Sequence, residues 1–210
     1  MSTLLHLDAS VRPEGLSREL SGRFADRWCA ADDDRTVVRR DLAADPLPHV
    51  ARGPADHLMY RTATGEAPDE VRRCHELIDE LSGADRLLMS MPMYNFTVPS
   101  TVKAWIDHIA WPGLTFDPAA GRGLFDDVPA VVIVTRSGGY GPSSPKADFN
   151  FLEPYLTKVL GFLGIHDVEF IVSELRLFAR DRSLDPQLTV LADQGHAEAL
   201  ARIDELTPVA

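Results

Sequence analysis

Apolar and polar residues follow two patterns along this chain: short continuous apolar runs and longer stretches in which apolar residues recur every three or four positions. The short runs predict strands, and a stretch with helical spacing comes after each of them. Strands that alternate with helices predict a parallel sheet with helices on both faces. The predicted strands are 3–7, 36–40, 86–91, 130–134 and 168–172, and the predicted helices are 16–28, 68–81, 99–109, 152–163 and 186–206.

Two strand orders are common in such doubly wound sheets, and the end of the first strand distinguishes them. A dinucleotide-binding Rossmann domain needs G-x-G-x-x-G at this point. Here the strand runs into Asp8-Ala9-Ser10-Val11-Arg12, and only Gly15 lies nearby. We therefore expect an α/β fold of the flavodoxin-like kind, a three-layer sandwich whose five-stranded parallel sheet has the order 2-1-3-4-5.

Length, charge and cysteine content exclude several classes of protein. A chain of 210 residues fits one domain over residues 1–210. The net charge of −11 argues against nucleic acid or an anionic lipid surface as partner, and no apolar run is long enough for a membrane span. The N-terminus lacks the basic region of a secretory signal. Cys29 and Cys74 have no metal-ligand spacing, so we expect reduced thiols, no metal site and a cytoplasmic location.

The loop after the first predicted strand combines hydroxyl groups, a glycine and a cation. In open parallel sheets, ligands bind at the carboxyl ends of the strands, where the winding reverses. Ser10, Arg12, Gly15 and Ser17 come just before or at the start of the first helix. Free N–H groups at a helix start favour a phosphate monoester, which both serines could contact. The structural alternative is that Ser17 caps the helix.

The loops after the third and fourth strands carry aromatic residues and glycines. Pro92 is followed by Met93-Tyr94-Asn95-Phe96, a mixture of aromatic area and amide groups that suits a planar heteroaromatic ring. Alternatively, Phe96 fills the core. The fourth strand ends in Arg136-Ser137-Gly138-Gly139, whose backbone N–H groups could face the edge of such a ring. An ordinary glycine turn is the alternative here.

Other catalytic signatures are not found in the sequence. It contains no G-x-S-x-G, no G-x-x-x-x-G-K-[ST] and no H-E-x-x-H. His108 follows an apolar helix position and is interpreted as a surface or internally hydrogen-bonded histidine. We therefore expect no side chain to act as a nucleophile or metal ligand.

Several of these segments closely resemble the FMN-dependent NADH:quinone reductase/azoreductase family. They are residues 92–96, 98–107 and 113–116, and the likeness extends from residue 3 to about residue 175. The resemblance implies a flavodoxin-like homodimer with one FMN per subunit near the dimer interface. It also implies FMN contacts from three loops. The residues are Ser10, Arg12, Gly15, Leu16 and Ser17; Pro92, Met93, Tyr94, Asn95 and Phe96; and Arg136, Ser137, Gly138 and Gly139.

Two departures from the family pattern fall within these loops. Gly15 stands where the family has the first serine of a phosphate-binding S-x-S, and Arg136-Ser137 reverses the family's S-R order. The first change could weaken phosphate binding, with Arg12 as a substitute. The second could change contacts at one edge of the flavin.

The resemblance implies an enzyme that passes a hydride from NADH or NADPH through flavin N5 to quinones or azo compounds, by a ping-pong mechanism. Two other activities stay open: a flavodoxin-type electron carrier, and a tailoring reductase for one polyketide quinone. The apolar residues of 111–127 could wall the substrate cavity across a dimer interface, or form a flap over their own sheet. These residues are Trp111, Leu114, Phe116, Leu124 and Phe125.

Overall fold

A five-stranded parallel sheet forms the centre of the computed structural model, which describes residues 1–51, 69–126, 128–181 and 183–208. Its order is β2-β1-β3-β6-β7, which is the predicted 2-1-3-4-5 with the strands renumbered, and the prediction is confirmed. The first residue of the second predicted helix, Pro68, lies outside the described residues. The strands are β1 (Ser2–Asp8), β2 (Arg35–Asp41), β3 (Arg86–Pro92), β6 (Ala130–Thr135) and β7 (Val168–Ser173).

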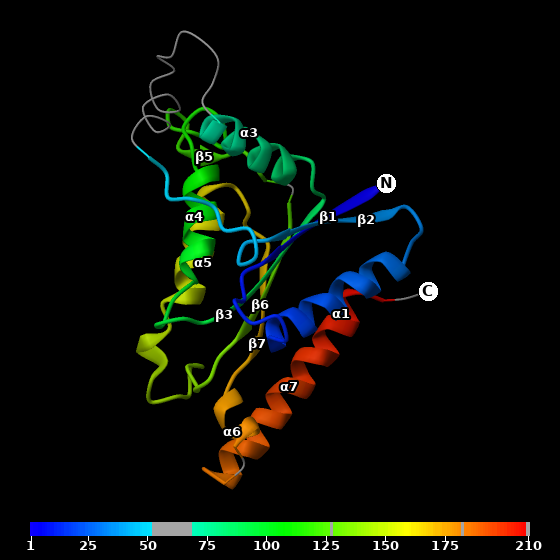
Figure 1. The fold of residues 1–210 in the computed structure, drawn as a ribbon, viewed down its shortest axis with the longest axis vertical. Helices are drawn as coiled ribbons and strands as arrows, with labels where there is room; N and C mark the ends of the chain where they lie inside the picture. Colours follow the sequence, from blue (N-terminus) through cyan, green and yellow to red (C-terminus); the bar gives the residue numbers. More distant parts are fainter. Residues whose placement is uncertain (52–68, 127, 182, 209–210) are drawn as a thin grey trace.

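Helices cover both faces of this sheet (Figure 1). On one face lie α1 (Leu16–Ala30) and α7 (Pro186–Leu206), which contact each other. On the other face lie α3 (Asp69–Ser82), α4 (Ser100–Ile109) and α5 (Leu152–Phe162). The sequence did not predict the short helix α6 (Arg176–Arg180) or the 3₁₀ turn Ala147–Phe149, because neither is long enough to show a period.

The alternation of side chains along the strands creates two separate cores. Leu4 of β1 packs with α1 and α7, whereas its neighbour Leu5 packs on the face covered by α3, α4 and α5. The interior strand β6, between β3 and β7, is buried on both faces, which explains why its sequence is a continuous apolar run. The carboxyl ends of β1, β3 and β6 therefore meet at one edge between two fixed layers.

A small hairpin connects α4 to β6. Its strands are β4 (Phe116–Asp117) and β5 (Arg122–Gly123). Trp111 and Phe125, which flank the hairpin, are only 7% and 6% exposed and belong to the core. These two residues therefore pack as part of a flap over the protein's own sheet and do not face a dimer interface. Of the apolar residues expected here to face a partner, only Leu124 is largely exposed.

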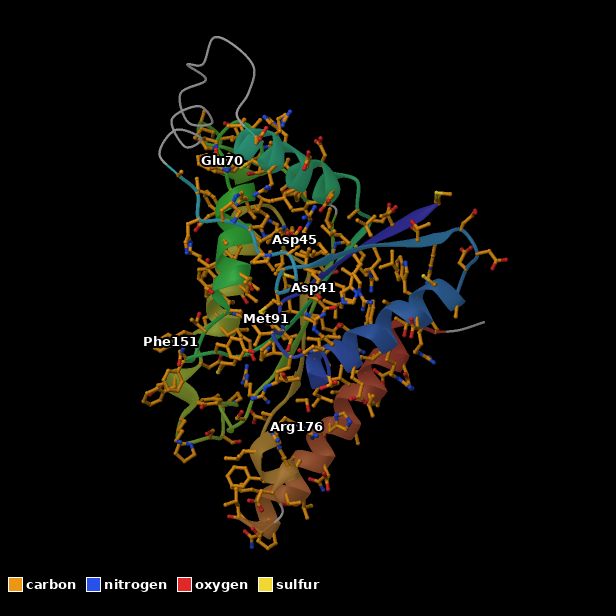
Figure 2. The ribbon with its side chains drawn as sticks, viewed as in Figure 1. Asp41, Asp45, Glu70, Met91, Phe151 and Arg176 are labelled. Carbon is orange, nitrogen blue, oxygen red and sulfur yellow. The ribbon has the colours of Figure 1, made fainter. Side chains whose placement is uncertain are left out.

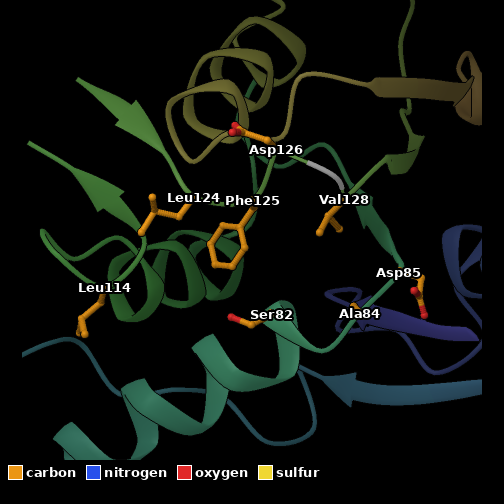
Figure 3. A pocket seen from close by; sticks show the side chains of 8 residues that line it. All are labelled: Ser82, Ala84, Asp85, Leu114, Leu124, Phe125, Asp126 and Val128. Carbon is orange, nitrogen blue, oxygen red and sulfur yellow. The ribbon is translucent and has the colours of Figure 1, made fainter. Parts of the chain in front are cut away.

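Two further observations concern regions away from the carboxyl edge. No helix in the described part of the chain combines the length and apolarity that crossing a bilayer requires. A cavity of about 430 Å³ lies at the opposite end of the sheet, where Asp85 precedes β3 and Val128 precedes β6 (Figure 3). Leu114, Leu124 and Phe125 of the hairpin region line this cavity, which lies away from the three loops expected to bind the cofactor.

Candidate functional site

A cavity of about 200 Å³ lies at the carboxyl ends of β1, β3 and β6, where the ligand was expected. It brings together most of the predicted site residues and two that were not predicted, Thr135 and Arg176. Asn95, Phe96, Gly138 and Gly139 do not line it. The lining residues are Ser10, Arg12, Gly15, Leu16, Ser17, Pro92, Met93, Tyr94, Thr135, Arg136, Ser137 and Arg176.

The start of α1 faces this cavity without a cap. Gly15 is the N-cap residue, and no side chain accepts a hydrogen bond from the first turn. The alternative that Ser17 caps the helix is therefore wrong. The Ser17 hydroxyl is buried and makes no hydrogen bond to any residue that the structure describes. Because the first N–H groups of a helix have no intrahelical acceptor and carry a partial positive charge, this end of α1 is suited to an anion.

Close packing in the first loop explains why residue 15 is a glycine. A Cβ atom at Gly15 would lie 2.5 Å from Ser10 Oγ and 3.0 Å from the Arg12 carbonyl oxygen. The Gly15 φ of −72° is open to any residue, so the requirement is for space and not for backbone conformation. Ser10 is 3% exposed, and its hydroxyl lies 3.3 Å from the Arg12 backbone nitrogen. A serine at position 15 would collide with Ser10 in this arrangement.

Arginines from three segments line the cavity, but their charges are not equally available. Arg12 is exposed and has no ion pair among the described residues. Within the described part of the chain, the Arg176 guanidinium makes one long hydrogen bond, of 3.5 Å, to the Ala192 carbonyl. In contrast, Arg136 is buried between two carboxylates, Glu153 and Glu174, and its burial lowers its pKa. Arg12 and Arg176 are therefore the cavity arginines whose charge is not neutralised by a carboxylate among the described residues.

The second loop is a strained turn. Tyr94 and Thr97 exchange backbone hydrogen bonds of 3.0 and 3.1 Å, and both residues between them have positive φ angles. Asn95 (47°) tolerates this conformation, but Phe96 (73°) does so at a cost of about 1 kcal/mol. The Phe96 ring is 40% exposed and packs on Tyr140 and Phe149, so it does not fill the core. Such strain concentrates at functional sites.

Glu174 holds the third loop against the end of β7. Its carboxylate accepts a 2.9 Å hydrogen bond from the Tyr140 N–H and pairs with Arg136. The Gly138 carbonyl oxygen accepts a hydrogen bond from Leu175 N, and the Gly139 carbonyl oxygen accepts one from Ser144 Oγ. Gly139 lines a second cavity, of about 540 Å³, between this loop and α7. The loop is thus more firmly held than an ordinary glycine turn.

The cavity residues that the sequence interpretation missed come from the same edge of the sheet. Thr135 is the last residue of β6, one position before the segment that was singled out. Arg176 starts α6, after β7, and the left-handed conformation of Leu175 (φ 61°) directs the chain there. The loop after the fifth predicted strand ends at the same edge of the sheet, so Arg176 could have been predicted as a site residue by including that loop.

Comparison with known proteins agrees with the fold. A family model described as a flavodoxin-like fold matches residues 2–191. The chain belongs to the flavodoxin-like fold family. An FMN-dependent NADH:quinone oxidoreductase of Streptomyces coelicolor is 39% identical to it over 218 aligned residues, covering 99% of this chain and 96% of that protein. One of Xanthobacter autotrophicus is 43% identical and covers 80% and 84% of the two chains.

Solved structures of the same fold family are also similar. An azoreductase from Bacillus anthracis has a TM-score of 0.83 at 22% identity, covering 99% of each chain. A second structure, an FMN-dependent NADH-azoreductase from the same species in complex with FMN, has a TM-score of 0.80 at 20% identity, covering 99% of this chain and all of the other. The sequence relatives confirm the resemblance to the quinone reductase/azoreductase family, and these structures agree with the fold.

Proposed function

We propose that this member of the flavodoxin-like fold family is an FMN-dependent oxidoreductase that uses NADH or NADPH to reduce quinones, azo compounds or both. The relatives that bear the name FMN-dependent NADH:quinone oxidoreductase support this function over nearly the whole chain. The observation that carries it is the buried Ser17 hydroxyl, which has no partner among the residues described, beside the uncapped start of α1. A buried polar group without a partner is costly, and a phosphate oxygen would satisfy it.

The described residues fit FMN. Ser10, Ser17 and the first N–H groups of α1 would hold its phosphate, and Arg12 and Arg176 would supply positive charge. Tyr94 and Met93 line the same cavity and would hold the part of the cofactor next to the phosphate end. Asn95, Gly138 and Gly139 lie on the adjoining loops and are proposed for the ring edge.

When bound, FMN supplies the redox chemistry by accepting a hydride from the nicotinamide and giving one to the acceptor. The side chains of this site bind and orient, and none of them needs to act as a nucleophile. The Phe96, Tyr140 and Phe149 rings form an aromatic wall next to the turn at Asn95. That wall offers stacking area for a planar acceptor such as a quinone.

We further propose a homodimer, whose interface lies on α5 and not on the hairpin, which the sequence offered as one of two alternatives. Phe149, Phe151 and Phe162 are each about half exposed, on or just before this helix. Phe151 lies at the outer side of the molecule in Figure 2. Exposed aromatic side chains gathered on one face are typical of an interaction surface. Light scattering should give about twice the chain mass of 23.1 kDa, and a monomer at all concentrations would contradict the dimer.

We expect the whole chain to act as one FMN-binding domain in the cytoplasm. Cys29 and Cys74 are both unpaired in the structure, as this location favours.

The cofactor can be tested with protein purified without added flavin, and the activity can be tested with the same protein after saturation with FMN. Release by heat and chromatography should give FMN and not FAD. NADH and NADPH should each be tested with a benzoquinone and an azo dye, and parallel double-reciprocal lines are expected for a shared binding face. Intersecting lines would contradict the ping-pong mechanism. If neither nicotinamide reduces the bound flavin, the electron carrier would replace the reductase.

A further inference from the structure

We propose that Arg18 is a positioning residue for the phosphate end of the FMN site: it fixes the loop between β1 and α1 without lining the cavity itself. The proposal rests on the proposed function, because it concerns the phosphate of FMN. Arg18 lies on the first turn of α1, and its side chain is only 18% exposed. The cavity is lined by its neighbours, Leu16 and Ser17, but not by Arg18.

The guanidinium of Arg18 joins two segments of the chain that are far apart in sequence. Nε and Nη2 donate to the Ser10 carbonyl oxygen at 3.2 and 2.7 Å. Nη1 and Nη2 donate to the two carboxylate oxygens of Asp41 at 2.7 and 2.8 Å. Such a two-pronged contact needs the planar fork of arginine and holds the side chain in one orientation. The end of β2 is thereby connected to the loop after β1.

Both carboxylates near Arg18 are themselves fixed. Asp41 accepts hydrogen bonds from the backbone N–H groups of Ala43 and Ala44, and the Arg18 guanidinium lowers the pKa of Asp41 to about 2. Asp8, whose carboxylate lies 3.6 Å from Arg18 Nη1, is buried and accepts a hydrogen bond from Ser90. The carbonyl of Ser10 is therefore attached, through Arg18, to the ends of β1 and β2.

The position of Ser10 matters because the first loop has no spare room. Ser10 Oγ lies where a Cβ on residue 15 would collide with it, so a small displacement of Ser10 changes the space next to Gly15. It would also move the Ser10 hydroxyl away from the phosphate. Without Arg18, the two accepted hydrogen bonds that hold the Ser10 carbonyl are lost.

A different explanation is that Arg18 attracts the phosphate by its charge alone. The substitution Asp41→Asn separates the two explanations. It keeps the Arg18 charge and removes a nearby negative charge, so attraction alone predicts tighter FMN binding. Positioning predicts weaker FMN binding, because the amide cannot accept both of the Arg18 hydrogen bonds.

The test compares FMN with riboflavin, which lacks the phosphate, by quenching of flavin fluorescence on binding to the flavin-free protein. Arg18→Met should weaken FMN binding about tenfold and change riboflavin binding by less than about twofold. Arg18→Lys should recover only part of the loss. Asp41→Asn should weaken FMN binding several-fold. The control is Arg23→Met, on the same helix, which removes a similar two-pronged pair with Asp204 and should leave both affinities unchanged.

Three other results would overturn the proposal, each for a different reason. Equal losses of FMN and riboflavin affinity in both Arg18→Met and Asp41→Asn would overturn the proposal and reduce Arg18 to a support of the fold. Tighter FMN binding by Asp41→Asn would overturn it in favour of attraction by charge, and this variant decides the matter if Arg18→Met does not fold. Wild-type protein that binds neither flavin would overturn the proposed function and this inference together.

Discussion

The starts of α1 and α7 lie on the same face of the sheet but are built in opposite ways. Asp185 caps α7, and its carboxylate accepts hydrogen bonds from Gln187 N and Leu188 N at 2.8 and 3.2 Å. Gly15 gives α1 no such cap, and the Ser17 hydroxyl has no partner in residues 1–51, 69–126, 128–181 and 183–208. Capping contributes about 1 kcal/mol to a helix. A helix start left without this contribution, at the ligand edge of the sheet, is suited to an anion that would complete it.

The layers beneath the two helices differ in the same sense. Below α7 the strands contribute apolar side chains such as Ile171 and Val131. Below the start of α1 the floor is polar: His6, Asp8 and Ser90 are all fully buried or nearly so. Asp8 and Ser90 are hydrogen-bonded to each other, whereas the His6 ring makes no hydrogen bond to the described residues, so the burial of His6 costs free energy. The following variants test this contrast.

The largest effect is expected from the titration of His6. Burial lowers the pKa of His6 to about 4, and neither ring nitrogen is hydrogen-bonded to a described residue. In the unfolded chain the His6 imidazole has its ordinary pKa of about 6.5, so it binds a proton at a higher pH than in the folded protein. The free energy of unfolding is therefore highest above pH 6.5 and falls as the pH drops towards 4. The loss should be ~3 kcal/mol, measured by urea unfolding at several pH values. His6→Met should flatten this dependence, whereas His75→Gln, at an exposed histidine, should not. An unchanged slope in His6→Met would contradict the assignment.

A negative charge introduced at the uncapped start of α1 should strongly weaken FMN binding. Ser17→Asp places a carboxylate where the phosphate would lie, so FMN affinity should fall about a hundredfold. The flavin-free protein should not lose stability by the same amount, because an acid in the first turn of a helix is favourable. Ser17→Ala is the matched control, and its FMN affinity should be lower than that of the wild type by about tenfold or less. Equal effects of the two substitutions would show that the carboxylate does not meet the phosphate.

Removing the cap of α7 should lower the stability of the protein and leave its FMN affinity unchanged. Asp185→Ala removes the cap of α7 and should lower the free energy of unfolding by about 1 kcal/mol. FMN affinity should stay within about twofold of wild type, since Asp185 does not line the cavity. A larger loss of FMN binding would mean that the two helix starts are coupled.

The smallest effect on stability is expected at the strained turn of the second loop. Asn95→Gly keeps the positive φ and should change the free energy of unfolding by less than ~0.5 kcal/mol. It removes the amide proposed for the ring edge, so turnover with NADH and benzoquinone should fall several-fold. Asn95→Leu keeps the side-chain volume but adds about 1–2 kcal/mol of left-handed strain, so it is the less informative variant. Unchanged turnover in Asn95→Gly would remove Asn95 from the site.

The sequence by itself determined the layers of this protein and most of the residues at the ligand edge. Continuous apolar runs such as Ala130–Val134 can be satisfied only by burial on both faces, and helical spacing fixes which side of each helix is buried. The order of the strands places the loops after β1, β3 and β6 together, so residues such as Ser10 and Ser17 could be assigned to one site. These features depend on local periodicity and on chain connection, which a sequence contains directly.

Only the tertiary structure decided which polar groups are free and which are paired. Arg136 and Arg12 are alike in sequence, yet Arg136 is neutralised by Glu153 and Glu174, whereas Arg12 is free among the described residues. The role of Arg18 depends on Ser10 and Asp41, at the ends of two strands. The burial of Trp111 and Phe125 depends on how the hairpin packs against the core. Hydrogen bonds and burial between distant segments depend on distances of a few ångströms, which no pattern along the chain encodes.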